Sequence, residues 1–157
     1  MSVTFNPIGK VKLKNGKYFI ELEERLFVAT LGLEDFSHIQ VLCWFNLYDS
    51  PESRDYLVVD KPYKKGPGRI GVLATRSPVR PNPIALSACA LLGVDKKNHR
   101  LEVAYIDAEN ETPVLDIKPY EPSDDLVRDV RMPAWCAHWP KCLEESADFD
   151  WDGEFNF

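Results

Sequence analysis

With 157 residues, 45% of them hydrophobic and 28% charged, the chain has the size and composition of a single globular domain. No apolar run approaches the ~20 residues of a membrane-spanning helix, and the N-terminus lacks a signal-peptide pattern, so a cytoplasmic protein without membrane contact is expected. The net charge of −6 is uneven: residues 1–106 hold 15 Lys and Arg against 11 Asp and Glu, whereas residues 107–157 hold 4 against 14. Basic residues concentrate between Lys61 and Arg80, which fits either an anion-binding face or a solvated loop.

The first third of the sequence has the alternation of a strand meander. Ile8–Leu13 and Tyr18–Glu23 flank Asn15-Gly16, a dipeptide typical of a hairpin turn. Leu26–Leu31 is predicted to be a third strand. Ser37–Tyr48 is rich in β-branched and aromatic residues and is predicted to be a central strand.

The middle of the chain continues with short strands between turns. Residues 49–68 form a polar loop interrupted by Tyr56–Val59. Further strands are predicted at Ile70–Thr75, Ile84–Val94, Leu101–Ile106 and Val114–Ile117. Many short strands with turn signals between them indicate a barrel or a sandwich. We expect a mainly β fold, a small β-barrel of short, mostly antiparallel strands.

The composition changes after Pro122, where acidic residues, prolines and aromatic residues become frequent. This change predicts a β-barrel domain over residues 1–125 and an acidic, aromatic C-terminal extension over residues 126–157. The extension is expected to be short and irregular or helical, and to pack on the barrel or on a partner chain. Its last residues, Phe149–Phe157, alternate aromatic and acidic side chains, which favours docking against an apolar groove over disorder.

The segment Arg76–Pro83 (RSPVRPNP) combines three prolines with two arginines. Each proline fixes φ at about −65° and pushes the preceding residue into an extended conformation, so a rigid, extended arm is expected. A rigid arm loses little entropy when its guanidinium groups bind a carboxylate or a phosphate. The alternative is a stiff connector whose arginines lie in water.

Two further segments carry chemically versatile side chains. In Glu111–Tyr120 (ETPVLDIKPY), Asp116 and Lys118 lie on the same side of an extended chain. They are expected to form either a surface ion pair or a matched acceptor and donor for a zwitterionic ligand. Cys136–Cys142 (CAHWPKC) contains three possible zinc ligands but lacks a fourth and a CxxC spacing, so no metal is expected and the four cysteines are interpreted as reduced thiols.

Three of these stretches resemble the signature blocks of the TsaA-like family (TrmO, formerly YaeB or VirR). They are FSH at Phe36–His38, GVLATRSPVRPNPIALS at Gly71–Ser87 and TPVLDIKPY at Thr112–Tyr120. The resemblance extends from about Ile8 to Pro122. It implies a small β-barrel that binds S-adenosylmethionine and works as a homodimer. It also implies methylation of N6 of threonylcarbamoyladenosine in tRNA, the activity of the characterised members.

The resemblance also implies a set of site residues. Asn46-Leu47 stands where bacterial members have His-Gln, and their Pro-Arg-Gln segment after the first strand is absent from this sequence. The expected cofactor-binding residues are Arg76, Leu86, Asn46, Asp107, Ala108, Glu109 and Asn110. Arg80 belongs to the signature and is expected to bind substrate; apart from the resemblance, the residues themselves add Asn82, as a hydrogen-bonding group, and Lys64, Lys65 and Arg69 of the basic segment. The expected catalytic residues are Asp116, as proton acceptor or as partner of the cofactor's ammonium group, and Lys118.

Three functions are compatible with the sequence. The first is a tRNA methyltransferase whose basic segment follows the RNA backbone. The second is a methyltransferase for a small molecule, and the third is a binding module that has kept the barrel and lost the cofactor. Cofactor binding separates the third from the others, and salt-sensitive tRNA binding separates the first from the second.

Overall fold

The computed structural model describes residues 3–156 and divides into two compact units. The first unit comprises the residues up to Asp49 together with Pro83–Leu126, and the second comprises Ser50–Asn82 together with the residues from Val127 onward. The first unit ends at Leu126, but Ser50–Asn82, which the prediction placed in the barrel domain 1–125, belong to the second unit, so the division into residues 1–125 and 126–157 stays a prediction. None of the described helices is both long enough and apolar enough to cross a membrane.

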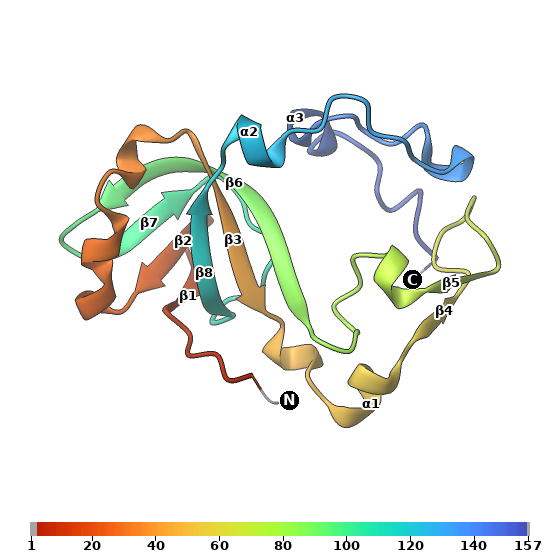
Figure 1. Cartoon of the computed structure of the whole chain (residues 1–157), viewed down its shortest axis with the longest axis horizontal. Helices are drawn as coiled ribbons and strands as arrows, with labels where there is room; N and C mark the ends of the chain where they lie inside the picture. The colour runs from red at the N-terminus through yellow and green to blue at the C-terminus, as the bar shows by residue number, and fades with distance from the viewer. Residues whose placement is uncertain (1–2, 157) are drawn as a thin grey trace. The chain divides into compact units, whose positions relative to one another are not determined.

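The first unit is a closed barrel of antiparallel strands (Figure 1), in the order β1-β2-β7-β6-β3-β8. This arrangement confirms the predicted mainly β fold. The strands are β1 (Gly9–Lys14), β2 (Lys17–Leu22), β3 (His38–Trp44), β6 (Ile84–Asp95), β7 (Arg100–Val103) and β8 (Pro113–Pro119).

The alternation of the strands builds the barrel core. One face of each strand contributes side chains that are almost completely buried, and these include Val11, Ile20, Ile39, Leu101 and Val114. The β1–β2 turn is formed by Asn15 and Gly16, with φ values of 52° and 74°. Both residues adopt the left-handed backbone that a two-residue hairpin turn requires, so the predicted hairpin is confirmed.

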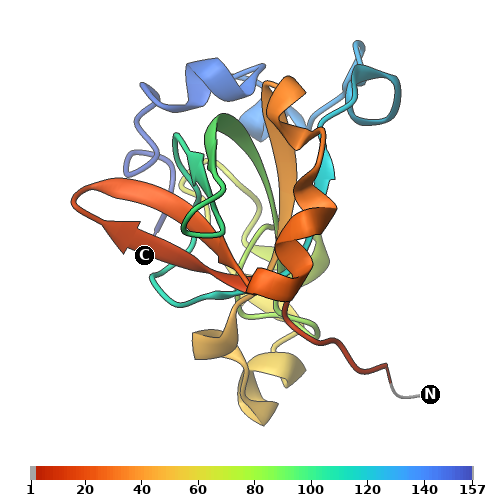
Figure 2. The same ribbon diagram turned by 90° about the vertical axis from the view of Figure 1, so that its left-hand side faces the viewer.

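The predicted strand at Leu26–Leu31 is wrong, because this segment belongs to the 3-10 helix η1 (Glu24–Thr30). Figure 2 shows its turns in orange after the β1–β2 hairpin. Phe27 and Thr30 are buried whereas Val28 is exposed, and a spacing of three residues brings side chains onto one side of a 3-10 helix. The Thr30 hydroxyl donates to the Phe27 carbonyl at 2.8 Å, which satisfies one terminal acceptor.

Three short helices complete the first unit: η2 (Leu33–Asp35), η3 (Asn46–Tyr48) and α2 (Pro122–Asp125). The central strand predicted over Ser37–Tyr48 therefore ends early, since β3 stops at Trp44. After that point the Phe45 amide donates to the Pro83 carbonyl at 2.8 Å, and the chain turns into η3.

The second unit contains a small sheet and short helices. They are α1 (Pro51–Asp55), β4 (Val58–Asp60), β5 (Arg69–Gly71), η4 (Val72–Ala74), η5 (Ala134–Cys136) and α3 (Leu143–Ser146). The strand predicted over Ile70–Thr75 is correct only as far as Gly71. Its partner β4 begins at Val58, opposite Gly71, so the ladder ends there and the chain bends to bury Val72.

Aromatic side chains form the packed centre of the second unit. Tyr63 stacks on Trp135 with ring centroids 4.9 Å apart, and Trp139 meets Trp151 edge to face at 5.3 Å. Tyr63 also forms a β-bridge with Phe155. The described part of the aromatic end, residues 149–156, therefore packs within this unit, while Phe157 lies outside the described residues. The predicted packing of the extension on the barrel or on a partner chain stays a prediction.

Candidate functional site

One end of the barrel gathers most of the site residues predicted in the first unit. Because the strands are antiparallel, the last residues of β3 face the first residues of β6 and β8: Trp44 pairs with Ile84, and Cys43 pairs with Val114. We call this end, where β3 finishes and β6 and β8 begin, the β3 end. Four predicted elements lie at or near it, namely Asn46 in η3, Leu86 in β6, Asp116 in β8 and the turn 107–110 that leads into β8.

A row of three outward side chains crosses the sheet near the β3 end. Leu42 of β3 pairs with Leu86 on one side and with Asp116 on the other, and residues paired in this way share one face of a sheet. The neighbours Val41 and Cys43 are buried in the core, so the row points outward. Leu86 is 47% exposed and so is the Asp116 side chain. An apolar surface and a carboxylate therefore lie side by side in reach of a ligand.

Asp116 and Lys118 form an ion pair, with 2.8 Å between Oδ2 and Nζ. The hydrogen bond to Asp116 and then its negative charge raise the pKa of Lys118 above the usual 10.5. Lys118 is therefore a cation at neutral pH and serves as a donor rather than as a base. The structure therefore has the surface ion pair, one of the two expected arrangements. Both side chains remain substantially exposed, so a ligand can still reach the carboxylate.

The turn 107–110 is fixed to the barrel at two points. Ala108 packs against the core cluster, and the side-chain oxygen of Asn110 accepts a hydrogen bond from the Leu13 amide at 2.9 Å. Asp107 and Glu109 are exposed. The turn thus offers two carboxylates on a backbone that is held by its neighbours.

The segment Arg76–Pro83, which belongs to the second unit as far as Asn82, is not the extended arm that its prolines predict, because the chain bends over residues 78–82. Hydroxyl groups redirect the backbone: the Ser77 amide donates to Thr75 Oγ1 at 3.1 Å, and the Val79 amide donates to Ser77 Oγ at 3.2 Å. Such local side-chain bonds compete with extended structure and favour turns. The predicted stiffness therefore has a second source, in hydroxyl groups as well as in prolines.

The polar residues of this bent segment have different environments. Arg80 donates to the backbone carbonyls of Thr75 at 3.3 Å and Ser77 at 3.4 Å, so its guanidinium group braces its own loop. Arg76 and Asn82 are exposed. Of the two arginines, Arg76 is the more exposed.

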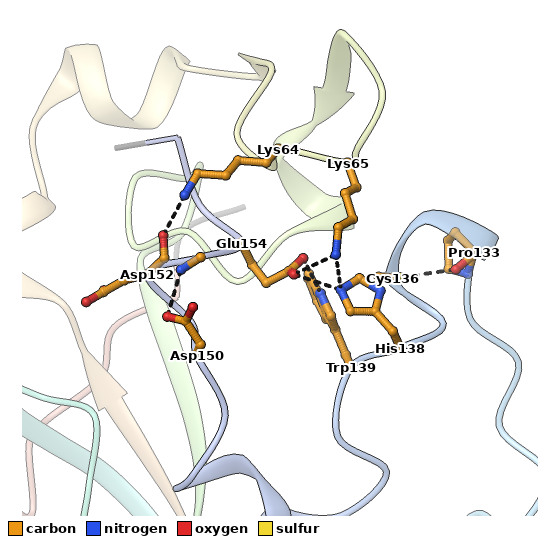
Figure 3. A network of polar contacts seen from close by, with 10 residues as sticks. Lys64, Lys65, Pro133, Cys136, His138, Trp139, Asp150, Asp152 and Glu154 are labelled. Atoms are coloured by element: carbon orange, nitrogen blue, oxygen red, sulfur yellow. Dashed lines mark hydrogen bonds and ion pairs between the residues drawn. The ribbon is translucent and has the colours of Figure 1, made fainter.

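Three of the predicted substrate-binding residues, all from the basic segment Lys61–Arg80, contact acceptors within their own unit. Lys64 Nζ donates to the Asp152 carbonyl at 2.9 Å, and Lys65 Nζ lies 3.2 Å from Glu154, as Figure 3 shows. Arg69 pairs with Asp60 across the β4–β5 hairpin at 3.2 Å. The acidic C-terminal residues thus meet the basic segment of the same chain.

Glu154 is the centre of a network that the sequence interpretation missed (Figure 3). Its carboxylate is only 7% exposed and binds His138 at 2.7 Å, Trp139 Nε1 at 3.1 Å and Lys65 at 3.2 Å. The hydrogen bonds from His138 and then from Trp139 lower its pKa to about 2. The available signal was an acidic residue within an aromatic stretch, which favours a buried and bonded carboxylate.

The Cys136–Cys142 segment contributes His138 to the network around Glu154. Cys136 is buried, with its Sγ 3.4 Å from the Pro133 carbonyl oxygen. Within residues 3–156, no group of three or more His, Cys, Asp or Glu side chains has the arrangement of a metal site.

Known proteins are similar to this chain in sequence and in fold. A probable S-adenosyl-L-methionine-binding protein of Pyrococcus abyssi is 37% identical over 149 residues, which cover 95% of this chain and 74% of that protein. The tRNA (adenine(37)-N6)-methyltransferase of Escherichia coli is 37% identical over 124 residues, covering 78% and 52% respectively. The crystal structure of TrmO from Pseudomonas aeruginosa matches with a TM-score of 0.65 at 30% identity, covering 85% of this chain and 62% of that one.

The family comparison matches the regions that carry the site. The chain spans about half the length of the Escherichia coli relative, and the family model for the tRNA-methyltransferase O N-terminal domain matches residues 5–126. This range contains all three sequence blocks on which the predicted resemblance to TrmO depends. The resemblance is confirmed, and the chain belongs to the tRNA-methyltransferase O N-terminal domain family.

Proposed function

We propose that this chain is an S-adenosylmethionine-dependent methyltransferase that modifies tRNA, at N6 of threonylcarbamoyladenosine, and that it works as a cytoplasmic homodimer. The observation that carries the proposal is the outward row Leu86–Leu42–Asp116 in a chain that the family model matches over residues 5–126. The relatives named as cofactor-binding proteins and methyltransferases support the choice of cofactor.

The residues present fit the chemical groups of S-adenosylmethionine. Its ammonium group needs an accessible acceptor, which Asp116 offers with a side chain that is 47% exposed. Its carboxylate needs a cationic donor, and the exposed Arg76 has the planar guanidinium that binds carboxylates in two-point fashion. Its adenine needs an apolar surface beside polar groups, which Leu86 and the turn 107–110 supply. We therefore propose Asp116, Leu86, the turn 107–110 and Asn46 as cofactor contacts of the first unit, and Arg76 by itself as a carboxylate-binding residue of the second unit.

When bound, the cofactor supplies a methyl group on a sulfonium centre. The chain has to align the acceptor nitrogen with that methyl group and to keep water away. A nitrogen acceptor also loses a proton, and receiving it is the alternative role proposed for Asp116 in place of holding the ammonium group. Lys118, which stays charged beside Asp116, is proposed to orient that carboxylate through their ion pair. Its role is positioning.

Replacement of Arg76 by alanine is expected to weaken S-adenosylmethionine binding about tenfold, because one charge-assisted interaction is removed. Calorimetric titration with S-adenosylmethionine and S-adenosylhomocysteine measures the effect. Arg69→Ala is the matched control, since it removes an arginine of the same unit that is largely exposed and paired with Asp60. If Arg76→Ala binds S-adenosylmethionine as tightly as the unmodified chain does, the assignment of Arg76 is wrong. If the folded, unmodified protein binds neither compound, the proposed methyltransferase function is refuted.

One observation favours a small-molecule acceptor as the second candidate. Lys64 and Lys65 are engaged by the chain's own C-terminal residues, which removes part of the surface predicted to follow RNA. Incubation with unmodified tRNA and labelled cofactor separates the candidates. Label transferred to tRNA supports the first, whereas cofactor binding without tRNA binding supports the second.

A further inference from the structure

The outer face of β1, β2 and β7 carries a concentration of cations that the proposed site does not use. In β1 the buried Val11 alternates with Lys10 and Lys12, so the lysines point away from the core. The register places Lys12 opposite Phe19 and Lys14 opposite Lys17. We call this surface the hairpin face; on it lie Lys10, Lys12, Lys14, Lys17, Phe19, Glu21, Arg100 and Glu102.

The hairpin face contains a depression of about 270 Å³. Three of the lining residues are cations, one is a carboxylate and one is an aromatic ring. The lining residues are Lys12, Leu13, Lys14, Phe19, Glu21, Arg100 and Asn110. The single carboxylate, Glu21, lies opposite Lys10 and Arg100 in the register. The depression therefore has a positive lining in a chain whose net charge is −6, which suits a small anionic group.

Arg100 is held in place within this depression. Its Nε donates to Asp95 at 3.0 Å, and its Cζ lies 4.4 Å from the centroid of the Phe19 ring. Its side chain is only 26% exposed. A guanidinium fixed by a carboxylate and an aromatic ring loses little conformational entropy when it binds a phosphate.

The two lysines differ in what restrains them. Lys12 pairs with Glu111, which also binds Lys10 at 2.9 Å. Lys14 is exposed and forms no ion pair within the described residues 3–156. Lys14 is thus the lysine of this depression that gains most from an external anion, because it gives up no partner to bind one.

We infer that this depression binds the phosphodiester backbone of tRNA. The inference rests on the proposed function. It provides a contact for tRNA that does not depend on Lys64 and Lys65. Asn110 lines the depression and also belongs to the turn 107–110 that is proposed to contact the cofactor. A phosphate held here brings its RNA next to that turn.

The test is a salt titration of tRNA binding by the full chain. Lys14→Gln is expected to weaken binding about threefold, and Lys12→Gln with Lys14→Gln about tenfold. The slope of log K against log salt is expected to fall by about 0.9 or less for each phosphate group that the variant no longer neutralises. Lys97→Gln is the control, because Lys97 is an exposed lysine in the β6–β7 turn that does not line the depression. Lysine variants with the affinity and slope of this control overturn the inference.

Cofactor titration of the same proteins distinguishes this inference from the proposed function. The lysine variants are expected to bind S-adenosylmethionine as the unmodified chain does. If the unmodified protein binds no cofactor but the lysine variants still weaken tRNA binding, the proposed methyltransferase function is refuted and the hairpin face is supported as a tRNA contact. Unmodified protein that binds cofactor but no tRNA overturns the hairpin face as an RNA contact.

Discussion

Gly9→Ala is expected to lower the free energy of unfolding by about 3 kcal/mol or more. Gly9 pairs with Leu22 of β2 and with Val114 of β8, so it lies where β1 closes the barrel. A methyl group at Gly9 would collide with the Glu21 carbonyl oxygen and come within 2.9 Å of the Leu22 Cα. Both are backbone atoms of a strand that is also paired with β7. The clash therefore cannot be relieved by a side-chain rotation, and a strand has to move.

Chemical denaturation of the two alanine variants, followed by circular dichroism, measures this difference. Gly93→Ala is the matched control, because it lies in β6 and no heavy atom is within 4 Å of a methyl group added there. The control is expected to change stability by about 0.5 kcal/mol or less. If Gly9→Ala unfolds at the same denaturant concentration as Gly93→Ala, the close approach at the β1–β2 seam does not restrict that position.

The barrel was predictable wherever local and global signals agree. Asn15-Gly16 specifies a two-residue hairpin, and the alternation around Val11 and Ile20 gives the face that becomes the core. The failure at Leu26–Leu31 has a simple reason. Apolar residues in that segment are close enough together to satisfy both a period of two and a period of three, and only the burial of Phe27 and Thr30 decides between them.

The candidate site shows the same division between local and distant information. Asp116 and Lys118 were predictable as a pair, since strand geometry places residues two apart on one face. The bend after Arg76 was not, because the proline rule favours an extended chain while hydrogen bonds to Thr75 and Ser77 oppose it. The contact between Lys65 and Glu154 spans 89 positions, and a single sequence contains no signal for such a pairing.

Glu154→Gln is expected to loosen the C-terminal segment from residues 61–65, with a loss of amide protection of about a hundredfold. The carboxylate accepts from His138, Trp139 and Lys65, and the neutral amide satisfies these donors poorly. The same segment is held by the Lys64 amide, which donates to the Glu154 carbonyl at 2.9 Å. Hydrogen exchange at that amide measures the effect. Asp148→Asn removes the same charge from an exposed position and is expected to leave protection unchanged.

Acid is expected to reproduce the effect of Glu154→Gln. The pKa of Glu154 is about 2 in the folded chain against an ordinary 4.5, so the folded state favours the ionised carboxylate. Its contribution to stability is therefore complete above the ordinary pKa and is lost as the pH falls from about 5 to about 2. The protection factor of the Lys64 amide should fall over this range in the unmodified chain and in Asp148→Asn. In Glu154→Gln that fall should be much smaller, because the titrating group is absent. An equal fall in all three proteins would mean that another group controls the docking of the segment.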